Sequence, residues 1–238
     1  MGTTVLIGRY IGEKKEQHIG PLIGGSALVY AIISAVLFVV LVCFPRQISA
    51  FMQAPQEALG LTASYVGMCG AGIVFIGAYN LLSAIFRGLG DSKSPLMFVA
   101  VACAVNIIGD LILVAGLKMD AAGAALATVL AQAISVIFAL VLLMKRQFGF
   151  RITKHDFRIN PHCLRALKIG LPLALQEFLT QVSFLALCAF VNRLGLEASS
   201  GYGVACKIVN FALLIPSSLM QSMASFVSQY VGAGTEKR

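Results

Sequence analysis

Residues 95–117 read PLMFVAVACAVNIIGDLILVAGL, an apolar run that contains one asparagine, Asn106, and one aspartate, Asp110. About 20 such residues are enough for a helix to cross the hydrocarbon core of a membrane. A carboxylate at that depth costs roughly 2.5–3.5 kcal/mol on insertion scales, so it is generally kept for ion or proton handling and faces the protein interior. Asn106 and Asp110 lie one helical turn apart and share a face. The stretch therefore predicts a membrane helix that carries part of a cation site.

The rest of the chain has the same apolar character. Of its 238 residues, 58% are hydrophobic and 12% are charged, whereas a soluble domain carries about 25% charged residues. We expect an all-α membrane protein with six full transmembrane helices and a partial one. Gly2–Ile11 is too short to span and is interpreted as the end of a helix, without a signal-peptide pattern. The six spans are expected at roughly 22–44, 59–85, 95–117, 121–144, 166–194 and 200–231.

Lysine and arginine are distributed unevenly between the loops. Alternate loops hold 14 of them on one side and 4 on the other, which is the positive-inside pattern. It predicts a multi-pass protein of the plasma (inner) membrane, with the chain start, the basic loop Lys145–Pro161 and the C-terminus in the cytoplasm. The net charge of +8 is then explained by topology, so we expect membrane lipid as a partner and no nucleic acid.

Thr128 extends the predicted cation site. It lies seven residues into the next span, and Asp110 lies seven residues before Leu117, so both are about 10 Å from the same end of two antiparallel helices. Amide, carboxylate and hydroxyl oxygens are hard ligands that suit Na⁺, and the carboxylate can instead hold H⁺. We predict a cation site at Asn106, Asp110 and Thr128. The alternative is a buried carboxylate bound to neighbouring polar groups without a transport role.

Glu177 is the other acid within an apolar run, and it follows Pro172 by five residues. Proline can kink a membrane helix and free a carbonyl. Glu177 and the adjacent Gln176 are either a substrate- or proton-binding pair, or a polar group near the cytoplasmic end that reaches water. The chain has no Ser/His/Asp or Cys/His set and no CxxC pair. We therefore expect no enzyme, no cofactor and no metal ion other than Na⁺ at Asp110. The three histidines are expected to be solvated.

A short internal repeat links the two ends of the chain. VLIGRYIG at 5–12 aligns with SFVSQYVG at 225–232, at an offset of 220. An even number of expected spans lies between the copies, so both would run in the same direction through the membrane. The halves would then be related by an axis along the membrane normal, as in many secondary transporters.

Three segments together resemble one transporter family. They are FRGLGDSKSP at 86–95, VNIIGD at 105–110 and AGAALAT at 122–128, and the end of the chain, QYVGAG at 229–234, is similar as well. The family is the multidrug and toxic compound extrusion (MATE) family. The resemblance implies twelve helices in two lobes and cation-driven export of amphipathic organic compounds by alternating access. It also implies a cation site at the positions of Asn106, Asp110 and Thr128, and more weakly a role for Glu177.

The resemblance also assigns the parts of the chain. Residues 1–144 would be the end of helix 2 and helices 3–6 of the N-terminal lobe, 145–162 the inter-lobe loop, and 163–238 helices 7–8. Small organic substrates and the remainder of the transporter are then the expected partners. Two alternatives remain: an inactive truncated membrane fragment, and a lipid-linked sugar flippase of the same superfamily. A flippase cavity needs positive charge for pyrophosphate, and the spans contain little.

Overall fold

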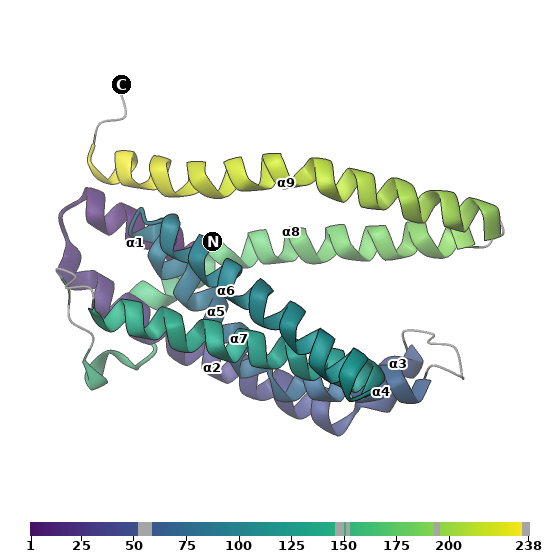
Figure 1. Cartoon of the computed structure of the whole chain (residues 1–238). Helices are drawn as coiled ribbons and strands as arrows, with labels where there is room; N and C mark the ends of the chain where they lie inside the picture. The colour runs from purple at the N-terminus through teal and green to yellow at the C-terminus, as the bar shows by residue number, and fades with distance from the viewer. Residues whose placement is uncertain (52–58, 146–149, 151–152, 193–195, 235–238) are drawn as a thin grey trace.

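The computed structural model describes residues 1–51, 59–145, 150, 153–192 and 196–234 (Figure 1). In this part of the chain every regular element is a helix, which confirms the predicted all-α class. The elements are α1 (Gly2–Gly12), η1 (Glu16–His18), α2 (Ile19–Cys43), α3 (Pro45–Phe51), α4 (Leu59–Ala71), α5 (Ile73–Gly88), α6 (Lys93–Asp110), η2 (Leu111–Gly116), α7 (Asp120–Lys145), η3 (Lys154–Asp156), α8 (Pro161–Asn192) and α9 (Leu196–Gly232).

Five helical segments are long and apolar enough to cross a membrane, at Glu16–Cys43, Lys93–Gly116, Asp120–Lys145, Pro161–Cys188 and Gly201–Gly232. The expected span at 59–85 is different, because α4 and α5 meet at a bend of 52°. Gly72 lies at this bend, and a side chain there would collide with Val129 of α7. The pair counts as one further, broken span, so the predicted set of spans is found with one interruption that hydropathy does not reveal.

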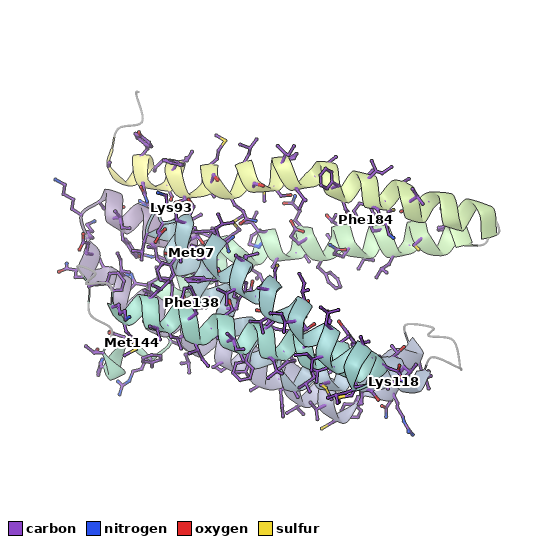
Figure 2. All side chains as sticks on the ribbon, viewed as in Figure 1. Lys93, Met97, Lys118, Phe138, Met144 and Phe184 are labelled. Carbon is purple, nitrogen blue, oxygen red and sulfur yellow. The ribbon has the colours of Figure 1, made fainter. Side chains whose placement is uncertain are left out.

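Helices α2, α4, α5, α6 and α7 form one bundle. Its core contains Phe86 of α5 and Phe98 of α6, both fully buried, with ring centroids 5.1 Å apart. Ser135 of α7 donates a hydrogen bond of 2.9 Å to the carbonyl oxygen of Phe98. Lys93 begins α6 and Lys118 follows η2, which continues from the end of α6. Apolar side chains cover the outer surface between these two lysines (Figure 2). Such a surface is suited to lipid rather than water.

The turn between α5 and α6 is capped by a side chain. Helix α6 begins at Lys93. Asp91 Oδ1 accepts hydrogen bonds from the backbone N–H groups of Lys93 and Ser94 at 3.0 and 3.1 Å. Gly90 has a φ of +81°, a conformation that glycine adopts without strain.

Helices α1 and α9 meet through small residues. A Cβ added at Gly12 would collide with the carbonyl oxygen of Gln229, and one added at Gly232 would collide with that of Arg9. In the repeat, Gln229 corresponds to Arg9 and Gly232 corresponds to Gly12. Each glycine therefore contacts the same position of the other copy. Gly8 similarly faces Ser228. The two copies of the repeat therefore run in parallel, side by side. We call the contact of Gly8 and Gly12 with Ser228 and Gly232 the α1–α9 seam.

Helices α8 and α9 contact the rest of the molecule only near one end of the pair, within the described residues. Cys163 packs against Gly25 of α2, and Ala166 packs against Gly2 of α1. Residues 171–187 of α8 and 207–220 of α9 are exposed. The α8–α9 pair and the bundle thus diverge from the seam (Figure 1). The predicted inter-lobe loop, 145–162, lies partly outside the described residues.

Candidate functional site

Helix α6 carries Asn106 and Asp110 on one face, as its sequence predicts, and both side chains are half-buried. Asp110 is the last α-helical residue. The next six residues, Leu111–Gly116, form a π-helical turn. In that turn the backbone N–H of Leu117 donates to the carbonyl oxygen of Ile112 at 2.9 Å. Widened turns of this kind occur frequently at functional sites. Asp110 therefore lies at the junction between two helical geometries.

Thr128 of α7 lies beside Asn106. The Asn106 Nδ2 atom donates a hydrogen bond of 3.3 Å to Thr128 Oγ1, which in turn donates to the carbonyl oxygen of Ala124 at 2.9 Å. The helices approach closely at this level, since a Cβ added at Gly109 would lie 2.9 Å from the Cβ of Ala127. Small residues permit such close packing of membrane helices. The structure thus brings together two of the three residues of the predicted site.

Asp110 has a different environment from this pair. Its Oδ1 atom is buried and has no hydrogen-bond partner among the described residues. A buried acceptor without a partner is expensive, and more so when it is charged. Such an oxygen can be satisfied by a proton or by a cation. The arrangement therefore leaves Asp110 able to take up either, one helical turn from the Asn106–Thr128 pair.

Tyr65 of α4 is a neighbour that sequence reasoning missed. It lies close enough to Asp110 for the two ionisable groups to interact electrostatically. Tyr65 is a polar aromatic residue inside an apolar helix, which is a weak signal on its own. Its depth could not be counted along the chain because the bend at Gly72 breaks the span into α4 and α5.

Glu177 and Gln176 lie on α8, apart from the α6–α7 site. Both side chains are exposed, and the carbonyl oxygen of Gln176 accepts a hydrogen bond of 2.9 Å from Thr180 Oγ1. Helix α8 packs on α1, α2 and α9. A role for these two residues in substrate or proton binding stays a prediction.

A sequence model of the MatE family matches residues 1–112 and 172–238 of this chain. The chain belongs to the MatE family. The matched residues include Asn106, Asp110 and Glu177, whereas Thr128 lies in the unmatched interval. The resemblance stated from sequence is therefore confirmed at the level of the family.

Several curated relatives are similar over nearly the whole chain. The probable multidrug resistance protein YoeA of Bacillus subtilis is 26% identical over 240 residues, which cover 98% of this chain and 52% of the relative. The multidrug export protein MepA of Staphylococcus aureus is 26% identical over 234 residues, which cover 96% of this chain and 51% of the relative. The chain thus spans about half the length of the curated relatives it matches.

Solved transporter structures share the fold of this chain. A MOP superfamily transporter from Pyrococcus furiosus aligns with a TM-score of 0.87 at 23% identity. The alignment covers 98% of this chain and 52% of that transporter's chain. An outward-facing MATE family multidrug resistance transporter aligns with a TM-score of 0.85, also at 23% identity. At this level of identity the comparison shows a common, all-helical fold.

Proposed function

We propose that this chain is part of a cation-coupled antiporter that exports amphipathic organic compounds by alternating access. The observation that carries the proposal is the unpartnered, buried Oδ1 atom of Asp110 beside the Asn106–Thr128 pair. A cation or a proton satisfies that oxygen, so its occupancy can be coupled to a change of conformation. The names of the relatives support drug export as the activity of the whole transporter. Either Na⁺ or H⁺ fits the residues present.

The lobe assignment belongs to the same proposal. Residues 1–144 form part of the N-terminal lobe, 145–162 the inter-lobe loop and 163–238 the start of the C-terminal lobe. The α1–α9 seam then joins the two lobes at their cytoplasmic ends, because α9 ends there and the segment that leads into α8 packs against the start of α2 at the same end of the molecule. The divergence of α8 and α9 from the bundle supports an outward-open arrangement, in which the cavity between the lobes opens away from the cytoplasm.

The efflux test compares two matched charge removals. Asp110→Asn removes the proposed site, while Asp120→Asn makes the same chemical change at an exposed position at the start of α7. In bacterial cells that lack their own exporters, a full-length transporter that contains this chain should raise resistance to cationic dyes, and Asp110→Asn in it should abolish that resistance. Asp120→Asn should retain it. Thr128→Ala should reduce resistance less than Asp110→Asn, since it removes one neutral ligand.

Two results would count against the proposal. Equal resistance in cells with Asp110→Asn and with the unchanged sequence would show that transport does not need the Asp110 carboxylate. A full-length transporter that inserts in the membrane but confers no resistance would contradict drug export as its activity. Membrane insertion is checked in each strain by the amount of chain recovered in the membrane fraction.

A further inference from the structure

A cavity of about 410 Å³ lies at the seam end of the molecule, far from Asp110 along the fold. It is formed where α1 ends, where η1 leads into α2 and where α8 begins. Its polar lining comes from all three segments. Besides Tyr10 and Glu13 it consists of basic side chains: Arg9, Lys15, His18, His162 and Arg165.

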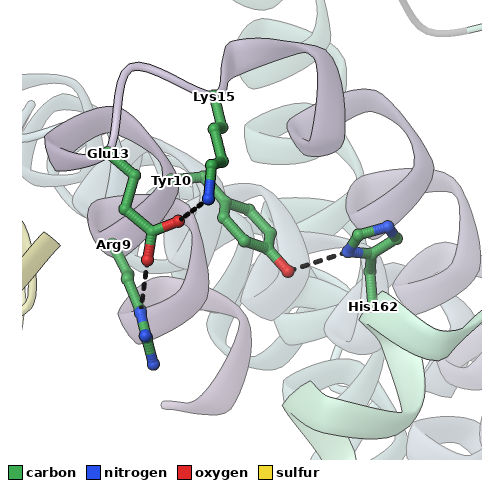
Figure 3. Close-up of polar contacts among 5 residues, drawn as sticks. All are labelled: Arg9, Tyr10, Glu13, Lys15 and His162. Atoms are coloured by element: carbon green, nitrogen blue, oxygen red, sulfur yellow. Dashed lines mark hydrogen bonds and ion pairs between the residues drawn. The ribbon is translucent and has the colours of Figure 1, made fainter.

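The cavity keeps a positive charge after its internal ion pairs are counted. Glu13 is its one carboxylate within the described residues. It forms ion pairs with two basic side chains, Arg9 and Lys15 (Figure 3). The Arg9 Nε atom lies 2.7 Å from Glu13 Oε1, and Lys15 Nζ lies 2.9 Å from Oε2. Hydrogen bonds from Lys15 and Arg9 hold the pKa of Glu13 below its ordinary value, so it stays ionised at neutral pH. Two permanent positive charges remain in excess, with Arg165 on the opposite wall.

Two histidines also line the cavity, His18 of η1 and His162 of α8. The rings of His18 and His162 stack with centroids 4.8 Å apart, although the sequence led us to expect solvated histidines. His162 Nδ1 lies 2.8 Å from the hydroxyl oxygen of Tyr10, which places the ring firmly between α1 and α8 (Figure 3). With Nδ1 accepting from the Tyr10 hydroxyl, the neutral ring carries its proton on Nε2 and can donate it to an anion beside Arg165.

Phosphate is the anion that best fits these groups. Guanidinium groups bind phosphate oxygens in a bidentate manner, and lysine binds them as a point charge. Helix α8 also begins here, with Asn160 Oδ1 accepting a hydrogen bond of 2.9 Å from the backbone N–H of Cys163, and the start of a helix favours negative charge. Basic pockets between membrane helices on the cytoplasmic side bind anionic lipid head groups.

We propose that this cavity binds a phosphate group, either the phosphodiester of an anionic lipid or free phosphate. Side chains of Arg9 and Lys15 remain 55% and 54% exposed, so the site is open to a head group from the adjacent membrane surface. Because its walls belong to α1 and α8, a bound phosphate would hold these two segments together at the seam end. This site is separate from the cation site, and its binding can be measured without transport.

Binding is tested on the whole chain in two arms. In the first, the chain in phosphatidylcholine nanodiscs is titrated with radiolabelled inorganic phosphate at constant ionic strength. In the second, native mass spectrometry measures whether the detergent-solubilised chain retains phosphatidylglycerol in preference to phosphatidylcholine. Binding in the first arm alone identifies free phosphate as the source, and binding in the second alone identifies the lipid.

Charge-removal variants locate the site. Arg165→Gln and Lys15→Gln lie on separate walls, and each should weaken binding about tenfold, as the loss of a charged hydrogen bond predicts. Lys168→Gln is the matched control, because Lys168 is exposed one turn further along α8 and does not line the cavity. It should change binding by less than about twofold. If one variant fails to fold, as judged by gel filtration, the other still tests the wall to which it belongs.

Two outcomes would overturn the proposal. One is the absence of binding in both arms at millimolar phosphate and at a tenfold excess of phosphatidylglycerol. The other is equal weakening by Lys168→Gln and Arg165→Gln, which would indicate a diffuse attraction to the basic face. Neither outcome would affect the proposed cation site, since no step of these measurements depends on Asp110.

Discussion

Asp110 keeps a buried carboxylate oxygen that receives no hydrogen bond from the described residues, although donors are available nearby on α6 and α7. The Asn106 amide is instead directed to Thr128. A structural role for Asp110 would require a partner whose loss destabilises the fold. Its environment is that of a group that carries a stability cost for the sake of binding, as at many functional sites.

The stability of Asp110→Asn tests this difference at the residue scale. The substitution removes a buried charge without breaking a described hydrogen bond of Oδ1, so the free energy of unfolding should be unchanged or higher by about 1 kcal/mol. That corresponds to a Tm higher by up to about 4 °C for a chain of this length. Circular dichroism during heating in detergent measures it. A Tm lowered by more than a few degrees would assign Asp110 a structural role.

Much of the site could be predicted from the sequence, and the limits have physical causes. The spacing of Asn106 and Asp110 fixes their common face, and counting residues from a short loop places Thr128 at the same depth. The π-helical turn after Asp110 and the approach of Tyr65 could not be predicted in this way. Both depend on how α4, α6 and α7 pack, which is not encoded in the spacing along one helix.

At the scale of helices, the limits lie where glycine permits close contact. Hydropathy predicts a single span at 59–85, but Gly72 meets Val129 of α7 and the span bends. The repeat, by contrast, predicts the common direction of α1 and α9 correctly, whereas their direct contact at Gly12 and Gly232 is not predicted by it. Asp91 caps α6, because its carboxylate reaches the first free N–H groups of the helix, those of Lys93 and Ser94.

Glycine-to-alanine substitutions measure the α1–α9 seam. A Cβ at Gly12 collides with the Gln229 carbonyl oxygen, and overpacking of this kind generally destabilises by about 1–3 kcal/mol. Gly203 of α9 has nothing within 4 Å of an added Cβ, so Gly203→Ala should be neutral or stabilising by up to about 1 kcal/mol. Thermal unfolding of the two variants makes the comparison. Equal Tm values would show that the seam does not contribute to stability.

At the scale of the whole molecule, the seam end should face the cytoplasm. The asymmetry of 14 basic residues to 4 predicts that cysteine at the exposed position 155 is protected from an impermeant thiol reagent in intact cells. Cysteine at position 119, beyond the opposite end of α6, should react. Both substitutions are made in a chain without its own cysteines. Labelling of His155→Cys and protection of Met119→Cys would reverse the orientation.

The bundle and the α8–α9 pair are also joined beside the seam by polar contacts from the end of α5. Arg87 Nη1 donates a hydrogen bond to Gln221 Oε1, Ser225 Oγ donates to the carbonyl oxygen of Arg87 at 2.7 Å, and Gln229 Nε2 donates to that of Gly88 at 3.3 Å. If transport proceeds by alternating access, these contacts must break for the cavity to open to the cytoplasm.

A cross-link between positions 87 and 221 should therefore hold the molecule in the conformation described here. In a full-length transporter without its own cysteines, Arg87→Cys with Gln221→Cys should be bridged by a short bis-methanethiosulfonate reagent, because the long native side chains meet at their ends, a span too wide for a direct disulfide. Efflux of a cationic dye should then stop and return on reduction, while each single variant keeps its activity under both conditions. Cation binding at Asp110 should persist in the cross-linked form, since that site lies on α6, away from the cross-link. Efflux that continues with the cross-link in place would show that the bundle and the α8–α9 pair need not separate here.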